Sequence, residues 1–302
     1  MSVLVLKLNA TGDVVRTTAL LHRLGGDVTW VTADANLALL SGARSDVRCL
    51  GWSSRDEALD RRYDLLINLE DDIEVARFAN RTEHAELFGA YSPDDVAVRY
   101  TDSARAWFDM SLISVYGRAK ADELKYHNRR TYQELIFEGL GFVFDEEPYV
   151  LPQTEPSDLV GDIAIAPVAG AVWPMKNWAY YGELKHGLES RGLVVNVLPQ
   201  RPTLLEHLAD VRGHKCLVSG DSLPMHLALG SGIPCVTIFN CTSPWEIHGY
   251  GLQRKIVSPR LGDFFYKRGM DEAATTAIPL DEVLTAVLEI MNGHVAEHAL
   301  QR

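Results

Sequence analysis

The stretch MSVLVLKLNATGDVVRTTALLHRL, Met1–Leu24, predicts a β-strand, a short turn and then an α-helix. Strand-forming residues, Val3 to Leu6, lead into the polar turn NATGDVV, and apolar residues then recur near helical spacing. The turn therefore falls at the carboxyl end of a first strand, where open α/β sheets present their ligands. Asp13 stands in this turn and is a candidate for chemistry, although helix capping is the plainer alternative.

The same alternation of strand and helix runs through both halves of the chain. A first series extends from Val3 to about Phe88, and a second begins at Ile163 and continues to Ser258. This rhythm predicts α/β architecture with parallel sheets covered by helices on both faces. Because the acidic, proline-containing segment Phe144–Pro156 separates the two series, we expect two domains, 1–150 and 151–302. The last helix could pack back on the first domain.

Composition excludes several classes of function. The 302-residue chain has a formal charge of -12, which argues against a nucleic-acid partner because phosphate binding needs clustered Lys and Arg. No apolar run approaches the roughly 20 residues of a membrane span, and the N-terminal stretch does not have the pattern of a secretory leader. We therefore expect a cytoplasmic protein without stable membrane insertion. The four cysteines form no CxxC pair, so neither a disulfide framework nor a zinc site is predicted.

The strongest local signal is SGDSLPMHLALGSGIPCVTIFNCTSP, Ser219–Pro244. A strand ends at Ser219, a Gly-Asp-Ser turn follows, and Pro224 stands at the start of a helix, where its missing N–H costs nothing. Free N–H groups at a helix start, together with the helix dipole, favour phosphate. The alternative is that Asp221 or Ser222 simply caps the helix.

This stretch is similar to the C-terminal signature of glycosyltransferase family 9, the ADP-heptose heptosyltransferases, which reads roughly GD(T/S)-x-PMH-L-A, then G-x-P, an apolar strand and F-G-x-TSP. LKLNATGDVVRTTALLHRL and KNWAYYGEL resemble two further elements of the family, in the expected order. The resemblance implies a GT-B fold, in which two Rossmann-like doubly wound domains face each other across a cleft. It also implies an inverting transferase that needs no metal or other cofactor.

The resemblance further implies the partners and the site. The expected reaction moves a sugar, heptose above all, from a nucleoside-diphosphate donor such as ADP-heptose to an acceptor nucleophile on a small molecule, a saccharide or a protein. The C-terminal domain would bind the donor and the N-terminal domain the acceptor. Asp13 takes the place of the catalytic base, Lys176 that of the phosphate-contacting lysine, and Asp221 that of the sugar-contacting aspartate.

The expected donor-binding residues are Lys176, Gly220, Asp221, Ser222, Leu223, Pro224, Met225, His226, Gln200 and Thr242, and the expected acceptor-binding residues are Thr11, Gly12 and Arg16. Gln200 or Glu206 would stand in for a glutamate that usually holds the nucleotide ribose in this family. A solvated helix arginine is an equal alternative for Arg16.

Other interpretations stay open. The chain could bind a nucleotide sugar without transferring it, or be a Rossmann-type oxidoreductase, although NATGDVV lacks the G-x-G-x-x-G turn. LEDDIE, Leu69–Glu74, could hold a divalent cation. The basic stretch Arg118–Tyr132 could meet a phosphorylated acceptor, although a solvated helix face is the plainer explanation. The imidazoles of HVAEH, His294–His298, are more simply explained as helix surface.

Overall fold

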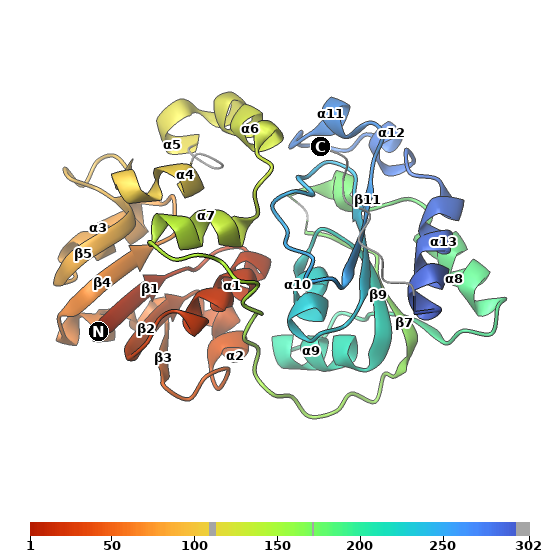
Figure 1. The fold of residues 1–302 in the computed structure, drawn as a ribbon, viewed down its shortest axis with the longest axis horizontal. Helices are drawn as coiled ribbons and strands as arrows, with labels where there is room; N and C mark the ends of the chain where they lie inside the picture. Colours follow the sequence, from red (N-terminus) through yellow and green to blue (C-terminus); the bar gives the residue numbers. More distant parts are fainter. Residues whose placement is uncertain (109–112, 171, 294–302) are drawn as a thin grey trace. The chain divides into compact units, whose positions relative to one another are not determined.

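A computed structural model describes residues 1–108, 113–170 and 172–293 and divides the chain into two compact units, Met1–Gln153 and Thr154–Arg302 (Figure 1). The division falls inside the proline-containing segment Phe144–Pro156. None of the described helices combines the length and the apolar character that crossing a membrane requires. The predicted imidazole pair His294–His298 lies outside the described residues.

The first unit is built on a six-stranded sheet with the order β3-β2-β1-β4-β5-β6. Val3–Leu6 are fully buried, which explains why this apolar run forms the central strand. The first five strands are parallel, and β6 pairs with β5 in the antiparallel sense. The strands are β1 Ser2–Leu6, β2 Asp27–Thr32, β3 Val47–Gly51, β4 Tyr63–Asn68, β5 His84–Tyr91 and β6 Arg99–Tyr100.

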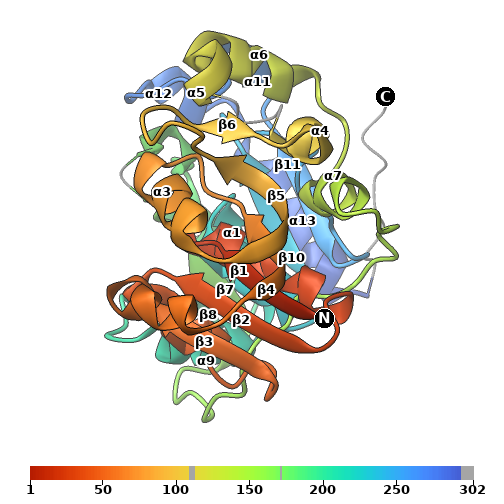
Figure 2. The same ribbon diagram turned by 90° about the vertical axis from the view of Figure 1, so that its left-hand side faces the viewer.

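Helices and 3-10 turns connect these strands. α3 buries one apolar face against β4 and β5 (Figure 2), whereas α6, within the basic stretch, is largely exposed. The elements are α1 Thr11–Thr17, η1 Thr18–His22, η2 Asp34–Asn36, α2 Leu37–Leu40, η3 Trp52–Asp60, α3 Ile73–Arg81, η4 Asp102–Ala104, α4 Arg105–Phe108, α5 Ile113–Tyr116, α6 Arg118–His127 and α7 Tyr132–Gly139.

The first helix is shorter than the apolar spacing up to Leu24 predicts. α1 ends at Thr17 and continues as the 3-10 turn η1. The hydroxyls of Thr17 and Thr18 donate to the carbonyls of Asp13 and Val15, both at 2.6 Å. Such bonds from side chain to backbone compete with the regular helix pattern.

The second unit is built on a five-stranded parallel sheet with the order β11-β10-β9-β7-β8. α8 and α13 lie beside each other on one face, and α9 and α10 pack together on the other (Figure 1). The last described helix, α13, therefore belongs to the core of the second unit. The elements are β7 Gly161–Ala166, η5 Pro174–Lys176, α8 Tyr181–Glu189, β8 Val195–Val197, α9 Leu204–Arg212, β9 His214–Gly220, α10 Leu223–Gly230, β10 Cys235–Phe239, β11 Gln253–Val257, α11 Leu261–Phe264, α12 Glu272–Thr275 and α13 Leu280–Met291.

The prediction of two Rossmann-like α/β units with parallel sheets is confirmed. Each sheet has a switch point, where the strand order reverses, between β1 and β4 in the first unit and between β7 and β9 in the second. Ligands of open α/β sheets bind outside the carboxyl ends of the strands at such points. The loop that leads to Asp13 follows β1, and the turn with Asp221 follows β9.

Candidate active site

The β1–α1 loop carries Asp13 in the first turn of α1. Ala10, just before the helix, has the left-handed value φ 56°, and its carbonyl accepts hydrogen bonds from the amides of Asp13 at 2.7 Å and Val14 at 3.1 Å. The side chain of Asp13 is 34% exposed, and its Oδ1 lies 3.0 Å from a guanidinium nitrogen of Arg16. The carboxylate is therefore held by its own helix yet partly accessible.

Arg16 is not the solvated arginine that one interpretation of the sequence suggests. Its residue is only 8% exposed, and the guanidinium carbon lies 3.9 Å from the centre of the Tyr132 ring. The hydroxyl groups of Tyr132 and Thr17 are 2.7 Å apart. Burial raises the pKa of Tyr132, so the phenol stays neutral. Arg16 thus acts from a buried position as the partner that orients the Asp13 carboxylate.

Asn36 fixes the same loop from the neighbouring connection. Its Nδ2 donates to the carbonyl of Leu8 at 2.7 Å, and its Oδ1 accepts from the hydroxyl of Thr11 at 2.8 Å. Asn36 is buried at the end of η2, after β2. Thr11 and Gly12 are half-buried, so the predicted acceptor side of the loop is partly open.

Glu70 fixes the loop from the opposite side, after β4. Its Oε1 accepts from Lys7 Nζ at 2.7 Å and from the amides of Leu8 at 2.7 Å and Asn9 at 2.9 Å. Lys7 and Glu70 side chains are both 7% exposed. This buried pair is not among the predicted site residues. Its signal is a lysine directly after one buried strand and a glutamate two residues after the neighbouring one.

The carboxylates of LEDDIE have structural partners. Glu70 is paired with Lys7, and Asp71 accepts a hydrogen bond from the Ser114 hydroxyl. Asp72 caps α3 by accepting from the amides of Glu74 at 2.8 Å and Val75 at 3.2 Å. Among the described residues, no group of three or more His, Cys, Asp and Glu side chains is placed to hold a metal ion. The metal-site interpretation of this segment is not supported.

In the second unit, Lys176 and Asp221 form a nearly buried ion pair. Lys176 Nζ donates to Asp221 Oδ2 at 3.0 Å and to the Asp221 carbonyl at 2.7 Å, and the two side chains are 14% and 15% exposed. Gly220 allows the backbone of Lys176 to lie close to the end of β9, because a Cβ at position 220 would lie 2.8 Å from the carbonyl oxygen of Lys176.

Asp221 is ionised at neutral pH. Burial alone would raise the pKa of its carboxyl. The charges of Lys176 and His226 and the hydrogen bonds of Lys176 and Thr242 outweigh burial and lower the pKa to about 2. The site therefore holds a fixed cation and a fixed anion side by side at the end of β9.

The N-terminus of α10 lies beside this pair and has no side-chain cap. Ser222 occupies the cap position in an extended conformation, but its hydroxyl bonds the Gly220 carbonyl at 3.3 Å and not an amide of the helix. The interpretation of Asp221 or Ser222 as a simple helix cap is therefore wrong. Pro224 has no amide hydrogen and the amide of Met225 donates to the Ser222 carbonyl at 3.1 Å, so Leu223 is the position in the first turn whose amide suits an anion.

The remaining predicted donor residues differ in exposure. Pro224, Met225 and His226 are buried, and the amide of Met225 already donates to the Ser222 carbonyl at 3.1 Å. Gln200 is exposed in the loop after β8. Glu206 instead closes a capping box at α9 by accepting from the amide of Thr203 at 3.0 Å and its hydroxyl at 2.8 Å, which occupies the carboxylate.

Several buried polar atoms near the ends of β9 and β10 have no hydrogen-bond partner among the described residues. Native proteins contain few such atoms, and each calls for an explanation. They include Ser219 Oγ, Asn240 Oδ1, Ser243 Oγ and Glu246 Oε1. Glu246, which is 5% exposed, is not among the predicted site residues. This polar surround suits a ligand rich in hydroxyl groups.

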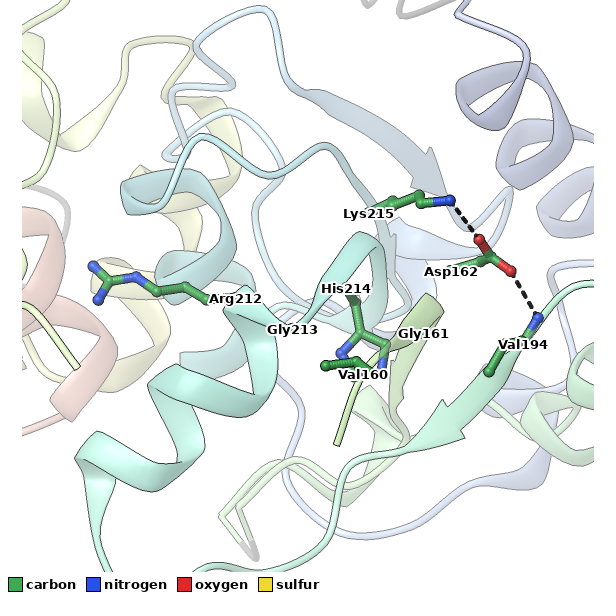
Figure 3. A pocket seen from close by; sticks show the side chains of 8 residues that line it. All are labelled: Val160, Gly161, Asp162, Val194, Arg212, Gly213, His214 and Lys215. Atoms are coloured by element: carbon green, nitrogen blue, oxygen red, sulfur yellow. Dashed lines mark hydrogen bonds and ion pairs between the residues drawn. The ribbon is translucent and has the colours of Figure 1, made fainter. Parts of the chain in front are cut away.

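A separate pocket of about 500 Å³ lies at the amino-terminal ends of strands of the second sheet, away from the Lys176–Asp221 pair (Figure 3). Gly161 and His214, which line it, begin β7 and β9, whereas Gly220 and Asp221 follow from the other end of β9. In Figure 3, Asp162 lies between Lys215 Nζ at 2.9 Å and the amide of Val194 at 2.8 Å. This pocket is therefore distinct from the predicted donor site.

Known proteins resemble the chain in sequence over part of its length and in fold over nearly all of it. The family model for glycosyltransferase family 9 (heptosyltransferase) matches residues 163–265. No curated protein sequence gives a match.

Three solved structures illustrate the likeness in fold. E. coli heptosyltransferase WaaC with ADP is 16% identical, with a TM-score of 0.62 over 97% of this chain and 100% of WaaC. A family 9 glycosyl transferase from Veillonella parvula is 15% identical, with a TM-score of 0.66 over 97% of each chain. E. coli ADP-heptose LPS heptosyltransferase II is 16% identical, with a TM-score of 0.56 over 97% of this chain and 100% of that one. The chain thus matches the family 9 (heptosyltransferase) model over residues 163–265 and has the GT-B fold of solved heptosyltransferase structures.

Proposed function

We propose that this chain transfers heptose from ADP-heptose to an acceptor nucleophile, with inversion at the anomeric carbon and without a metal. The observation that carries the proposal is the Lys176–Asp221 pair beside the uncapped N-terminus of α10. WaaC has been solved with ADP and with ADP-2-deoxy-2-fluoro heptose, which supports the choice of donor.

Lys176 and the backbone amides of Ser222 and Leu223 at the start of α10 would stabilise the leaving diphosphate. Negative charge grows on the diphosphate as the bond from the anomeric carbon to its oxygen breaks, and fixed donors lower the barrier by stabilising that charge. Removing one preorganised donor of this kind costs on the order of 3 kcal/mol, or about a hundredfold in rate. Asp221 would accept hydrogen bonds from sugar hydroxyls and hold Lys176 in place.

Asp13 would act as the general base. In an inverting displacement the acceptor oxygen attacks the anomeric carbon from the face opposite the leaving group, and its proton passes to a base on that side. The Asp13 carboxylate is partly exposed and oriented by Arg16, which suits this role. Thr11 and Gly12 would line the acceptor side, Gln200 would contact the nucleoside, and Thr242 would support Asp221.

A thermal-shift comparison of ADP-, GDP-, UDP- and dTDP-sugars tests the donor assignment, because a ligand that binds only the folded state raises the melting temperature. We expect ADP-heptose to raise it most, and Lys176→Ala to reduce that rise strongly. Lys215→Ala is the matched control, since Lys215 is also paired with an aspartate but lies at the opposite edge of the sheet. No shift with ADP-heptose, or an equal shift in both variants, would contradict the proposal.

Binding without transfer is the competing function. It predicts that Asp13→Asn changes neither donor binding nor the release of ADP. Transfer predicts unchanged donor binding and a collapse of ADP release, so the same variant separates the two functions.

A further inference from the structure

A pocket of about 390 Å³ lies at the carboxyl edge of the first sheet. Its size falls within the roughly 300–1,000 Å³ of small-molecule sites. The loops after four adjacent strands, β3, β2, β1 and β4, supply its walls, so it spans the switch point of this sheet. The lining residues are Leu8, Asn9, Ala33, Asp34, Trp52, Asp72, Glu74 and Val75.

The charged side chains in this lining are three carboxylates, with no Lys or Arg. Asp34 accepts from the hydroxyl of Ser53 at 2.5 Å and from its amide at 3.3 Å, and Asp72 caps α3. These hydrogen bonds fix the two carboxylates without adding a counter-charge, and neither aspartate is in an ion pair within the described residues. Glu74 pairs with Arg77. The pocket therefore presents negative charge to a ligand.

Trp52 provides an aromatic wall that its neighbours hold in place. Its ring lies edge-on to Phe78, with centroids 5.6 Å apart, and the Arg55 guanidinium carbon lies 4.4 Å from the ring centroid. Arg55 also donates to the Trp52 carbonyl at 2.7 Å. A fixed aromatic side chain among a few convergent polar groups is the usual composition of a small-molecule site.

The pocket shares a loop with Asp13. Leu8 and Asn9 line the pocket and directly precede Ala10, and their amides are both held by Glu70. A ligand in this pocket would therefore contact the same short segment that sets the position of Asp13.

We propose that this pocket is the acceptor subsite and that it takes a polyhydroxylated acceptor that is uncharged or carries amino groups. Hydroxyl and ammonium groups can donate hydrogen bonds to the carboxylates of Asp34 and Asp72, whereas a phosphate or carboxylate on the acceptor would meet like charge. This inference rests on the proposed glycosyl transfer and adds the chemical class of its acceptor.

Three trisaccharides of equal length test the inference by titration calorimetry without donor: a glucosamine trimer, an N-acetylglucosamine trimer and a galacturonic acid trimer. The measurement is made at a pH where the amines are protonated. We expect the glucosamine trimer to bind most tightly, the neutral trimer next and the anionic trimer last. No binding by any of the three, or strongest binding by the anionic trimer, would overturn the inference.

Asp34→Asn and Asp72→Asn remove the charge and keep one acceptor oxygen in each side chain. Each is expected to weaken binding of the glucosamine trimer by about two- to fivefold, the range of exposed charge pairs, and to leave the neutral trimer nearly unchanged. Asp27→Asn is the control, since Asp27 begins β2 at the opposite edge of the same sheet. Equal losses in all three variants would contradict the inference. Because no donor is present, failure here is distinct from failure of the transfer reaction.

Discussion

The buried pair of Lys7 and Glu70 supports the loop that carries Asp13, and Glu70→Gln tests its importance. In the folded protein one oxygen of Glu70 accepts hydrogen bonds from the Lys7 ammonium and from the amides of Leu8 and Asn9, at 2.7–2.9 Å. Glutamine is nearly the same size but uncharged. The substitution therefore leaves the Lys7 ammonium, whose side chain is 7% exposed, without its counter-charge.

The expected loss follows from that burial. Breaking a buried ion pair by removing one partner typically costs about 3–5 kcal/mol, because the remaining charge stays desolvated. We expect Glu70→Gln to lower the free energy of unfolding of the first unit by about this amount. The double variant Lys7→Met/Glu70→Gln should recover part of the loss, because it leaves no unpaired charge in the interior.

Urea unfolding gives the free energy, and amide hydrogen exchange at Leu8 and Asn9 gives the local effect. Both amides should exchange faster in Glu70→Gln, because their acceptor has lost its charge. Asp162→Asn is the control, since the Asp162–Lys215 pair is exposed on the lysine side and such pairs contribute at most about 1 kcal/mol. A loss below about 1 kcal/mol in Glu70→Gln, with unchanged exchange, would refute this reasoning.

Three further predictions follow from the second unit and the cysteines. The pKa of Asp221 is lowered from 3.8 to about 2, which contributes roughly 2 kcal/mol to the free energy of unfolding at pH values above 3.8. This contribution is lost as the pH falls from about 4 to 2. The difference in free energy of unfolding between wild type and Asp221→Asn, measured with urea, should therefore narrow over that pH range. Gly220→Ala should weaken ADP-heptose binding about tenfold or more in calorimetry, because a Cβ must displace the Lys176 carbonyl; wild-type affinity would contradict this. Burial raises the pKa of every thiol, to about 11 for Cys49 and Cys241, so iodoacetamide at pH 8 should modify the native protein far more slowly than the urea-unfolded chain, as judged by mass spectrometry.

Local patterns in the sequence carry much of the fold and part of the site. The continuous apolar run Val3–Leu6 predicts a strand buried on both faces, and it forms the centre of the first sheet. Asp221 was predicted beside the start of a helix, and its turn precedes α10 there. Strand, turn and helix signals are contained in a few residues each, so they can be identified without knowledge of tertiary contacts.

The supporting contacts depend on residues far apart in the chain. Glu70 meets Lys7 across 63 positions because β1 and β4 are parallel neighbours with Leu6 opposite Asn68. Arg16 is buried by Tyr132 of α7, which no local pattern around Arg16 indicates. Glu206 is different, because the spacing Thr203 to Glu206 is a capping-box signature that could have been identified from the sequence.

The claim that Asp13 is the general base is tested most directly by comparing wild type with Asp13→Asn. The assay measures the release of ADP from ADP-heptose, with uncharged and amine-bearing saccharides as acceptors. If Asp13 is the base, ADP-heptose affinity stays within about twofold of wild type while ADP release falls by about a hundredfold or more, the contribution of general base catalysis. ADP release by Asp13→Asn at the wild-type rate would contradict the account.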